Sequence, residues 1–216
     1  MLPEGWKRCL LGDLIRELES GVSVNGLDRP AEPGEAGVLK ISAVTSGIFD
    51  PQQNKAIRQD EVSRARSTPR ADRILVSRCN TAELLGASVY VDIDYPLLFL
   101  PDKLWQLEPV STDGICMRWL AGWLAADPTR SEISSLASGS SGSMKNIAKD
   151  SFLNLVVSVP PYDEQQSIAR ALATWDEAAR NLRSQILSLE KSKQALMQQL
   201  LTGKRRIRQR SVKAVS

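Results

Sequence analysis

The stretch that decides the fold is residues 160–203, PPYDEQQSIARALATWDEAARNLRSQILSLEKSKQALMQQLLTG. Its two leading prolines suit an extended lead-in and would break the interior of a helix. Asp163 can cap the first free N–H groups, and Gln166, three residues later, completes a capping box. Gly203 follows the last apolar residue, where a helix commonly ends in a left-handed residue. The stretch therefore predicts one long helix, residues 163–201.

Apolar residues recur along this helix at alternating steps of four and three. A 3.5-residue repeat sustained in this way is typical of a coiled coil. The alternative is a long helix lying on its own domain, which tends to have a wider apolar stripe of period 3.6. The stripe positions, which we expect to form a dimer interface, are Ile168, Leu172, Trp175, Ala179, Leu182, Ile186, Leu189, Lys193, Leu196 and Leu200.

One polar residue in the stripe, Lys193, indicates the orientation of the partner helix. In a parallel homodimer its ammonium would face its own copy in the same layer, whereas in an antiparallel pair a positions face d positions. An antiparallel pair also places Trp175 opposite a smaller side chain. The g positions carry no charge for parallel salt bridges. We therefore expect an antiparallel homodimer.

Residues 1–159 have a different sequence pattern, in which short apolar runs alternate with turn residues. We expect Trp119 and Trp123, four residues apart, to lie in the core rather than to stack on bases. Strands and helices alternate without a regular βαβ rhythm, which favours the α+β class. The expected organisation is a globular domain (1–159), a long coiled-coil helix (160–203) and a basic tail (204–216). Strands are predicted at 38–42, 73–77, 87–92, 96–100 and 153–159, and short helices at 12–18, 60–66 and 114–126.

The composition argues against several classes of protein. The chain has 216 residues, no histidine and three separated cysteines (Cys9, Cys79 and Cys116), which removes Ser-His triads and His-ligated metals and argues against a zinc or disulfide framework. No phosphate-binding GxxxxGK[ST] loop occurs. No apolar run is long enough to span a membrane, and the first residues lack the pattern of a signal peptide, so we expect a cytoplasmic protein.

The net charge of +3 is unevenly distributed. The tail carries six basic residues and no acid, which leaves residues 1–203 with 22 basic and 25 acidic residues, a balance of −3. Residues 55–78 hold seven basic and three acidic residues, and this stretch fits either a phosphate-binding patch or a solvated, salt-bridged face. The loop LASGSSGSMKNI (136–147) also fits two interpretations. It is either a flexible linker or a set of hydrogen-bond donors for phosphates and base edges.

Residues 160–207 resemble the conserved helical region of specificity (S) subunits of type I restriction–modification systems. Upstream, VLKISAV (38–44), residues 71–91 and residues 136–161 resemble strands and loops of the target recognition domain more loosely, with Ala71 in place of the usual glycine. The residues that carry the helical resemblance are Pro160, Pro161, Glu164, Gln165, Ile168, Ala169, Asp176 and Leu196 to Lys204.

The resemblance implies a non-catalytic subunit that reads a DNA half-site and directs partner subunits to it. A methyltransferase (M) subunit would bind S-adenosylmethionine, and a restriction (R) subunit, where one is present, would bind ATP and Mg²⁺, so no cofactor is expected in this chain. Typical S subunits carry two recognition domains and two helical regions, about twice this length. This chain has one of each, so we expect a half-size subunit whose antiparallel homodimer reads an inverted repeat.

Two other functions fit parts of the sequence. Val159-Pro-Pro-Tyr resembles the Pro-Pro-aromatic loop of amino-methyltransferases, but Val159 replaces the Asp or Asn that holds the target amine, and the missing motifs argue against a stand-alone methyltransferase or nuclease. A coiled-coil adaptor without a DNA role would explain the helix alone.

Loops at strand ends supply the candidate DNA contacts, which are Lys40, Ser42, Arg78, Asn80, Ser140, Ser141, Lys145 and Asn146.

Overall fold

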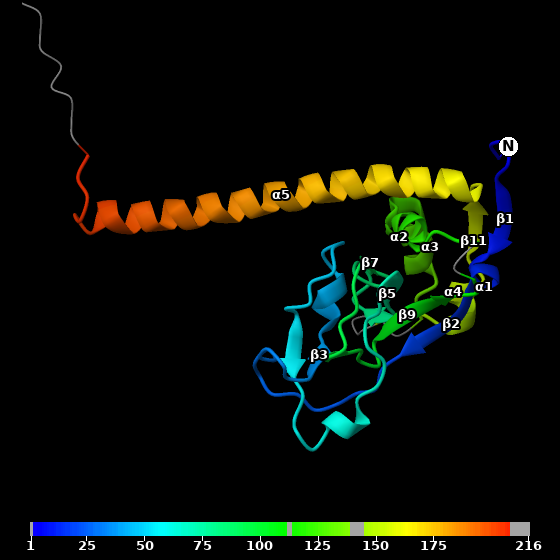
Figure 1. The fold of residues 1–216 in the computed structure, drawn as a ribbon, viewed down its shortest axis with the longest axis horizontal. Coiled ribbons are helices and arrows are strands. Elements are labelled where there is room, and N and C mark those ends of the chain that lie inside the picture. The colour runs from blue at the N-terminus through cyan, green and yellow to red at the C-terminus, as the bar shows by residue number, and fades with distance from the viewer. Residues whose placement is uncertain (1, 112–113, 139–144, 208–216) are drawn as a thin grey trace, which may run out of the picture. The chain divides into compact units, whose positions relative to one another are not determined.

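The computed structural model describes residues 2–111, 114–138 and 145–207 (Figure 1). Two units are distinguished, Met1–Ala169 and Arg170–Ser216. The long helix α5 (Tyr162–Leu201) begins in the first unit and makes up most of the second. Its first turns belong to the first unit because Gln165 and Ala169 are buried there.

A four-stranded antiparallel sheet forms the centre of the first unit. Its side chains alternate between two faces, as in any strand. On β9, for example, Trp105 and Leu107 point into one core, whereas Leu104 belongs to the other. The strand order is β2 (Ile15–Ser20), β9 (Leu104–Pro109), β5 (Arg73–Ser77) and β7 (Ser88–Val91).

Helices cover the first face of this sheet and bury the larger core (Figure 1). The ring of Trp105 lies 5.6 Å from that of Phe152, and Trp119 is buried while Trp123 packs against the same cluster. The prediction that both tryptophans of α2 are core residues is therefore confirmed. The helices are α2 (Met117–Ala125), α3 (Asp127–Ser135) and α4 (Lys149–Leu153).

The second face carries a smaller core that joins a second sheet. There Ala43 and Val44 of the 3₁₀ helix η1 (Ile41–Val44) pack with Leu75 and Val89. The second sheet has the order β4 (Asn54–Ala56), β3 (Gly37–Leu39) and β8 (Leu98–Phe99), in which β3 is antiparallel to β4 and parallel to β8.

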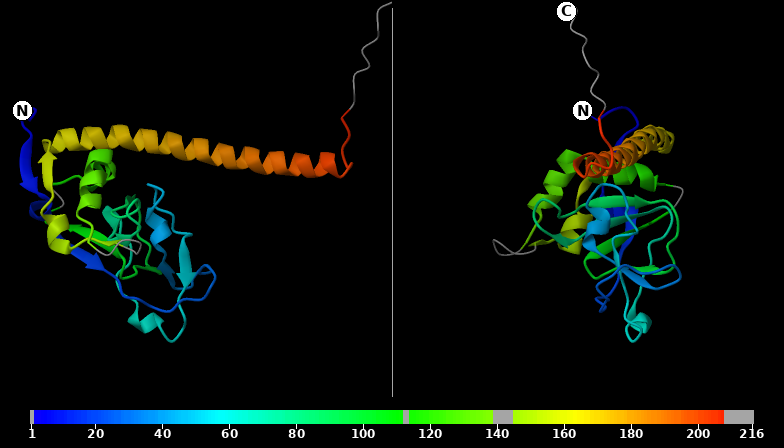
Figure 2. Two further views of the ribbon diagram at one scale, coloured as in Figure 1. Left: turned by 180° about the vertical axis from the view of Figure 1, so that it is seen from behind. Right: turned by 90° about the vertical axis from the view of Figure 1, so that its left-hand side faces the viewer.

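The chain ends of the first unit meet in a separate two-stranded ladder. Strand β1 (Lys7–Leu10) pairs antiparallel with β11 (Val156–Val159), and Figure 2 shows this blue strand beside the yellow one. Two prolines follow β11 and lead directly into α5. The short helix α1 (Leu11–Leu14) connects β1 to β2.

The α+β class and the long terminal helix are confirmed, but some local predictions were wrong. The predicted helix 12–18 is only the single turn α1, because residues from Ile15 onward pair with β9 as a strand. The predicted helix 60–66 is the 3₁₀ turn η2 (Val62–Arg64). Helix α5 begins at Tyr162, so Asp163 lies in its first turn and is not its cap. At the other end, Gly203 has the expected left-handed φ of 72°.

Candidate nucleic-acid interface

Four of the eight candidate DNA contacts meet in one short antiparallel ladder. Strand β6 (Cys79–Asn80) pairs with β10 (Lys145–Asn146), although the two are far apart in sequence. The backbone carbonyl of Arg78 extends this pairing by accepting a hydrogen bond of 3.0 Å from the N–H of Ile147. The candidates at 78, 80, 145 and 146 therefore lie on two adjacent, hydrogen-bonded segments.

A third segment lies on the other side of Arg78. The N–H of Arg78 donates to the Lys103 carbonyl at 3.1 Å, and its Nε donates to the Asp102 carbonyl at 2.7 Å. The Asp102 contact orients the guanidinium and leaves its two Nη groups for other acceptors. No ion pair joins Arg78, Lys103 or Lys145 to a carboxylate in the described ranges. Three cationic residues thus occupy neighbouring segments without forming an ion pair in the described part of the chain.

Lys103 is a residue that the sequence analysis missed. It stands shortly after the predicted strand 96–100, a place of the same kind as that of Arg78 after the strand 73–77. Applying the strand-end criterion to every predicted strand would have found it. What the sequence could not supply is the backbone bond that sets Lys103 beside Arg78.

Asn80 is engaged within the domain. The residue is buried, its Nδ2 donates to Ser77 Oγ at 3.4 Å, and its Oδ1 accepts from the Thr81 N–H at 2.9 Å. Both ends of the amide therefore hold the turn after β6. Its role in the ladder is to position the neighbouring residues, and Lys145 opposite it is more exposed.

The remaining candidates do not join this ladder. Lys40 follows β3, and Ser42 lies in η1, where its Oγ bonds to Gln53 Oε1 at 3.0 Å. Both belong to the side of the central sheet that carries the smaller core, whereas Ile147 next to β10 packs in the larger core. Ser140 and Ser141 lie outside the described residues.

The basic stretch 55–78 is largely ion-paired, which favours a salt-bridged face over a phosphate-binding patch for most of it. Most of its cations contact a carboxylate, so the stretch reads as a salt-bridged face. The deepest acceptor is Glu108, whose side chain is 7% exposed and bonds to both Arg70 and Arg73. The other pairs are Lys55–Asp28, Arg58–Asp60, Arg64–Glu61 and Arg70–Glu19.

Most of the predicted dimer stripe is exposed along α5. Exposed fractions of its large apolar side chains in the second unit range from 40% at Leu172 to 76% at Trp175, and Leu200 is intermediate. Ile168 differs, because it is partly buried against the larger core of the first unit. An exposed apolar stripe of this length is unusual on a soluble helix without a partner.

Within residues 2–111, 114–138 and 145–207, no group of three or more His, Cys, Asp or Glu side chains is arranged to hold a metal ion. No helix in the same ranges has both the length and the apolar character needed to cross a bilayer. The three cysteines form no disulfide in these ranges.

Comparison with known proteins assigns this fold to a family. Residues 3–191 match the model of the type I restriction modification DNA specificity domain. The chain belongs to this family. The resemblance to S subunits is confirmed, with the match extending into the helical region as far as residue 191, and a coiled-coil adaptor without DNA recognition is not favoured.

A curated member of the specificity-domain family gives the sequence relationship. The specificity subunit of the type I restriction enzyme EcoEI from Escherichia coli is 25% identical over 193 residues, which cover 88% of this chain and 32% of the relative. The present chain therefore spans about a third of the length of that subunit.

Solved structures of the specificity-domain family share the fold. The S subunit from M. genitalium matches with a TM-score of 0.64 at 16% identity, covering 90% of this chain and 45% of its own. The HsdS subunit from Thermoanaerobacter tengcongensis matches with a TM-score of 0.59 at 19% identity, covering 91% and 48%. A third structure, from a study of assembly and conformational transition of the type I R-M system, has a TM-score of 0.58 at 19% identity and covers 92% and 46%.

Proposed function

We propose that this chain is a non-catalytic DNA specificity subunit of a type I restriction–modification complex, acting in the cytoplasm. The observation that carries the proposal is the match of residues 3–191 to the DNA specificity domain. The residue content agrees, because the chain has no histidine and no nucleotide-binding loop. Partner subunits then carry out catalysis. A methyltransferase subunit binds S-adenosylmethionine and, where present, a restriction subunit binds ATP and Mg²⁺.

In this proposal the first unit reads a short DNA half-site with the segments around β6 and β10. Arg78, Lys103 and Lys145 supply cations for phosphates or guanine edges, and Asn146 supplies an exposed amide. Lys40 and Ser42, with Ser140 and Ser141, remain proposed contacts. Since residues 1–203 are net acidic, the isolated chain should bind DNA weakly, and the partner subunits supply further phosphate contacts.

The second unit acts as a dimerisation and spacing element. The 40 residues of α5 are about 60 Å long at 1.5 Å per residue, which exceeds one turn of B-DNA, about 34 Å. Two copies joined antiparallel through the α5 stripe would hold two recognition domains at a set separation. A two-fold homodimer would then read an inverted repeat.

The function is tested by co-expression. The full chain is produced with a methyltransferase subunit from a type I system, purified by a tag on one component, and the methylated sites are sequenced. A stable complex that methylates one defined sequence supports the proposal. The proposal is contradicted if the chain purifies without its cognate methyltransferase subunit, or if methylation does not depend on the chain.

The antiparallel pairing is tested on α5 itself. Ile186→Asp places a carboxylate in the stripe, and Ser184→Asp places the same charge on an exposed position outside it. Sedimentation equilibrium should show a dimer for the wild type and Ser184→Asp, and a monomer for Ile186→Asp. Cross-linking of single cysteines at the two ends of α5, in a background free of native cysteines, distinguishes the orientations. End-to-opposite-end links support the antiparallel form, and same-end links contradict it.

A further inference from the structure

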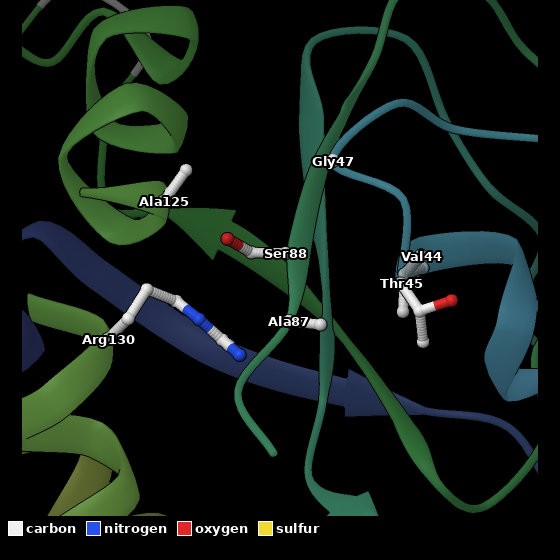
Figure 3. Close-up of a pocket in the computed structure, with 7 residues that line it drawn as sticks. All are labelled: Val44, Thr45, Gly47, Ala87, Ser88, Ala125 and Arg130. Atoms are coloured by element: carbon white, nitrogen blue, oxygen red, sulfur yellow. The ribbon is translucent and has the colours of Figure 1, made fainter. Parts of the chain in front are cut away.

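A small cavity lies at the free edge of β7 and contains none of the candidate DNA contacts. Its volume is about 110 Å³, several times the roughly 30 Å³ that one water molecule occupies in the liquid. It lies between the segment after η1, the start of β7 and the helices α2 and α3 (Figure 3). The lining residues are Val44, Thr45, Gly47, Ala87, Ser88, Ala125 and Arg130.

Two polar atoms of the lining residues are buried without a hydrogen-bond partner. They are Ser88 Oγ and Arg130 Nη1, and neither bonds to any residue in the described part of the chain. Ser88 as a whole is 6% exposed. Buried polar groups are almost always bonded, and leaving one unbonded costs about 1–3 kcal/mol. Figure 3 shows both side chains extending into the same space from β7 and α3.

The packing around α3 holds the guanidinium in this place. Arg130 Nη2 donates to the Glu83 carbonyl at 3.0 Å. Gly86 has a φ of +69° and lets α3 approach closely, because a Cβ there would lie 2.3 Å from Ile133 Cγ2 and 3.2 Å from Arg130 Nη1. Burial lowers the pKa of Arg130, since a desolvated cation without a counter-charge is disfavoured. An anion beside Nη1 would reverse that penalty.

The charges around the cavity select the class of ligand. Arg130 is the one charged residue among its lining residues, and the hydroxyl of Thr45 is already used as a donor to the Ser42 carbonyl. The nearby carboxylates of Glu83 and Asp127 line an adjoining depression that shares Arg130. A fixed guanidinium and a free hydroxyl, with no carboxylate in the cavity lining, match an oxyanion such as phosphate.

We propose that this cavity binds a phosphate group, with Arg130 Nη1 and Ser88 Oγ donating to its oxygens. Resting on the proposed function, we assign that phosphate to the DNA backbone, so the site positions the duplex and reads no base. The surroundings support this source. Thr45, three residues after the candidate Ser42, donates to the Ser42 carbonyl. Arg130 donates to the Glu83 carbonyl, three residues after Asn80. Two lining residues of the cavity therefore contact the segments that carry the two groups of candidate contacts.

The first arm of the test measures thermal unfolding of the full chain in inorganic phosphate and in chloride at equal ionic strength. The variants are Ser88→Ala and Arg130→Gln, with Arg118→Gln as the control, since Arg118 lies over the Tyr90 ring and does not line the cavity. Phosphate should raise the unfolding temperature of the wild type and the control. For the two cavity variants, the same rise should require a phosphate concentration at least tenfold higher. Ser88→Ala loses an unpaired hydroxyl, so in chloride it should be as stable as the wild type or more so.

The second arm measures duplex binding by the same proteins at several salt concentrations. Arg130→Gln loses one phosphate contact, so the magnitude of the slope of log K against log [salt] should fall by about 1. The slope should be unchanged in Arg118→Gln. A phosphate response with no change of slope supports the phosphate site and overturns DNA as its source. No phosphate response and no change of slope overturn the site, which then holds water only. If the wild type binds no duplex, the DNA-reading function fails while the first arm still decides the phosphate site.

Discussion

The side chain of Gln165 accepts a hydrogen bond at Oε1 from the backbone N–H of Cys116, at 2.8 Å. Its Nε2 donates to the Pro160 carbonyl at 3.0 Å, and the residue is 1% exposed. Cys116 immediately precedes α2, so one amide ties the start of α2, the exit of β11 and the first turn of α5 together. This arrangement gives a physical reason for a glutamine in the Glu164–Gln165 motif.

Replacing Gln165 by Ala should destabilise the first unit by about 2–4 kcal/mol, because the partly buried N–H of Cys116 and the buried carbonyl of Pro160 both lose their partner. The matched control is Gln166→Ala, which alters the next and more exposed residue of the same helix. Urea unfolding followed by tryptophan fluorescence measures the difference. Equal midpoints for the two variants would contradict the role of Gln165 as the junction residue.

Replacing Glu108 by Gln should be one of the most costly single changes on the second face of the central sheet. It removes the carboxylate that Arg70 and Arg73 share, at about 2–4 kcal/mol, and leaves the partly buried Arg73 unpaired, while Arg70 keeps its pair with Glu19. Asp60→Asn breaks the exposed pair with Arg58 and should cost less than about 1 kcal/mol. Denaturant unfolding of both variants checks the contrast, and a similar loss in the two would show that burial does not set the strength of these pairs.

Alkaline pH should weaken the fold through Tyr90. Burial, then the neighbouring Asp72 carboxylate, raises the pKa of Tyr90 from 10.0 to about 12. Between these values the folded chain keeps a proton that the unfolded chain has released. The free energy of unfolding therefore falls as the pH rises through this range. Unfolding measured across the range should show a shallower decline for Tyr90→Phe than for the wild type.

Asp72→Asn is the companion variant for Tyr90. It keeps the phenol but removes the carboxylate that accepts its hydrogen bond at 3.1 Å, so tyrosinate absorbance should appear at a lower pH than in the wild type. An unchanged tyrosinate titration in Asp72→Asn, or an unchanged decline in Tyr90→Phe, would show that this group does not control alkaline stability.

Lys103→Ala should weaken duplex binding and reduce the magnitude of the salt slope by about 1, because Lys103 forms no ion pair with a described residue and lies beside Arg78. Lys55→Ala is the control, since Lys55 already pairs with Asp28 at 3.2 Å. Fluorescence anisotropy with a labelled duplex at low salt measures both. Equal slopes for the two variants would remove Lys103 from the interface.

Much of the fold was predictable because it depends on short-range information. The heptad stripe, the two prolines before α5 and Gly203 after it delimit one helix, and neighbouring residues alone carry that signal. The strand 73–77 was predicted at its observed bounds for the same reason, as an apolar run between polar residues. The prediction of a helix over residues 15–18 was wrong because Ile15 and Leu18 are spaced as on a helix face, and only pairing with β9 makes them part of a strand.

The sequence by itself determined the long helix, the α+β class and the family to which the chain belongs, because helix period, turn residues and motif spacing are local properties. The tertiary structure alone decided which basic residues are free. It paired Lys55, Arg70 and Arg73 with acids from distant segments, namely Asp28, Glu19 and Glu108, and it set Arg78 between Lys103 and Ile147. The physical reason is that an ion pair or a strand register depends on which remote backbones the core brings within a few ångströms, and no window of sequence holds that distance.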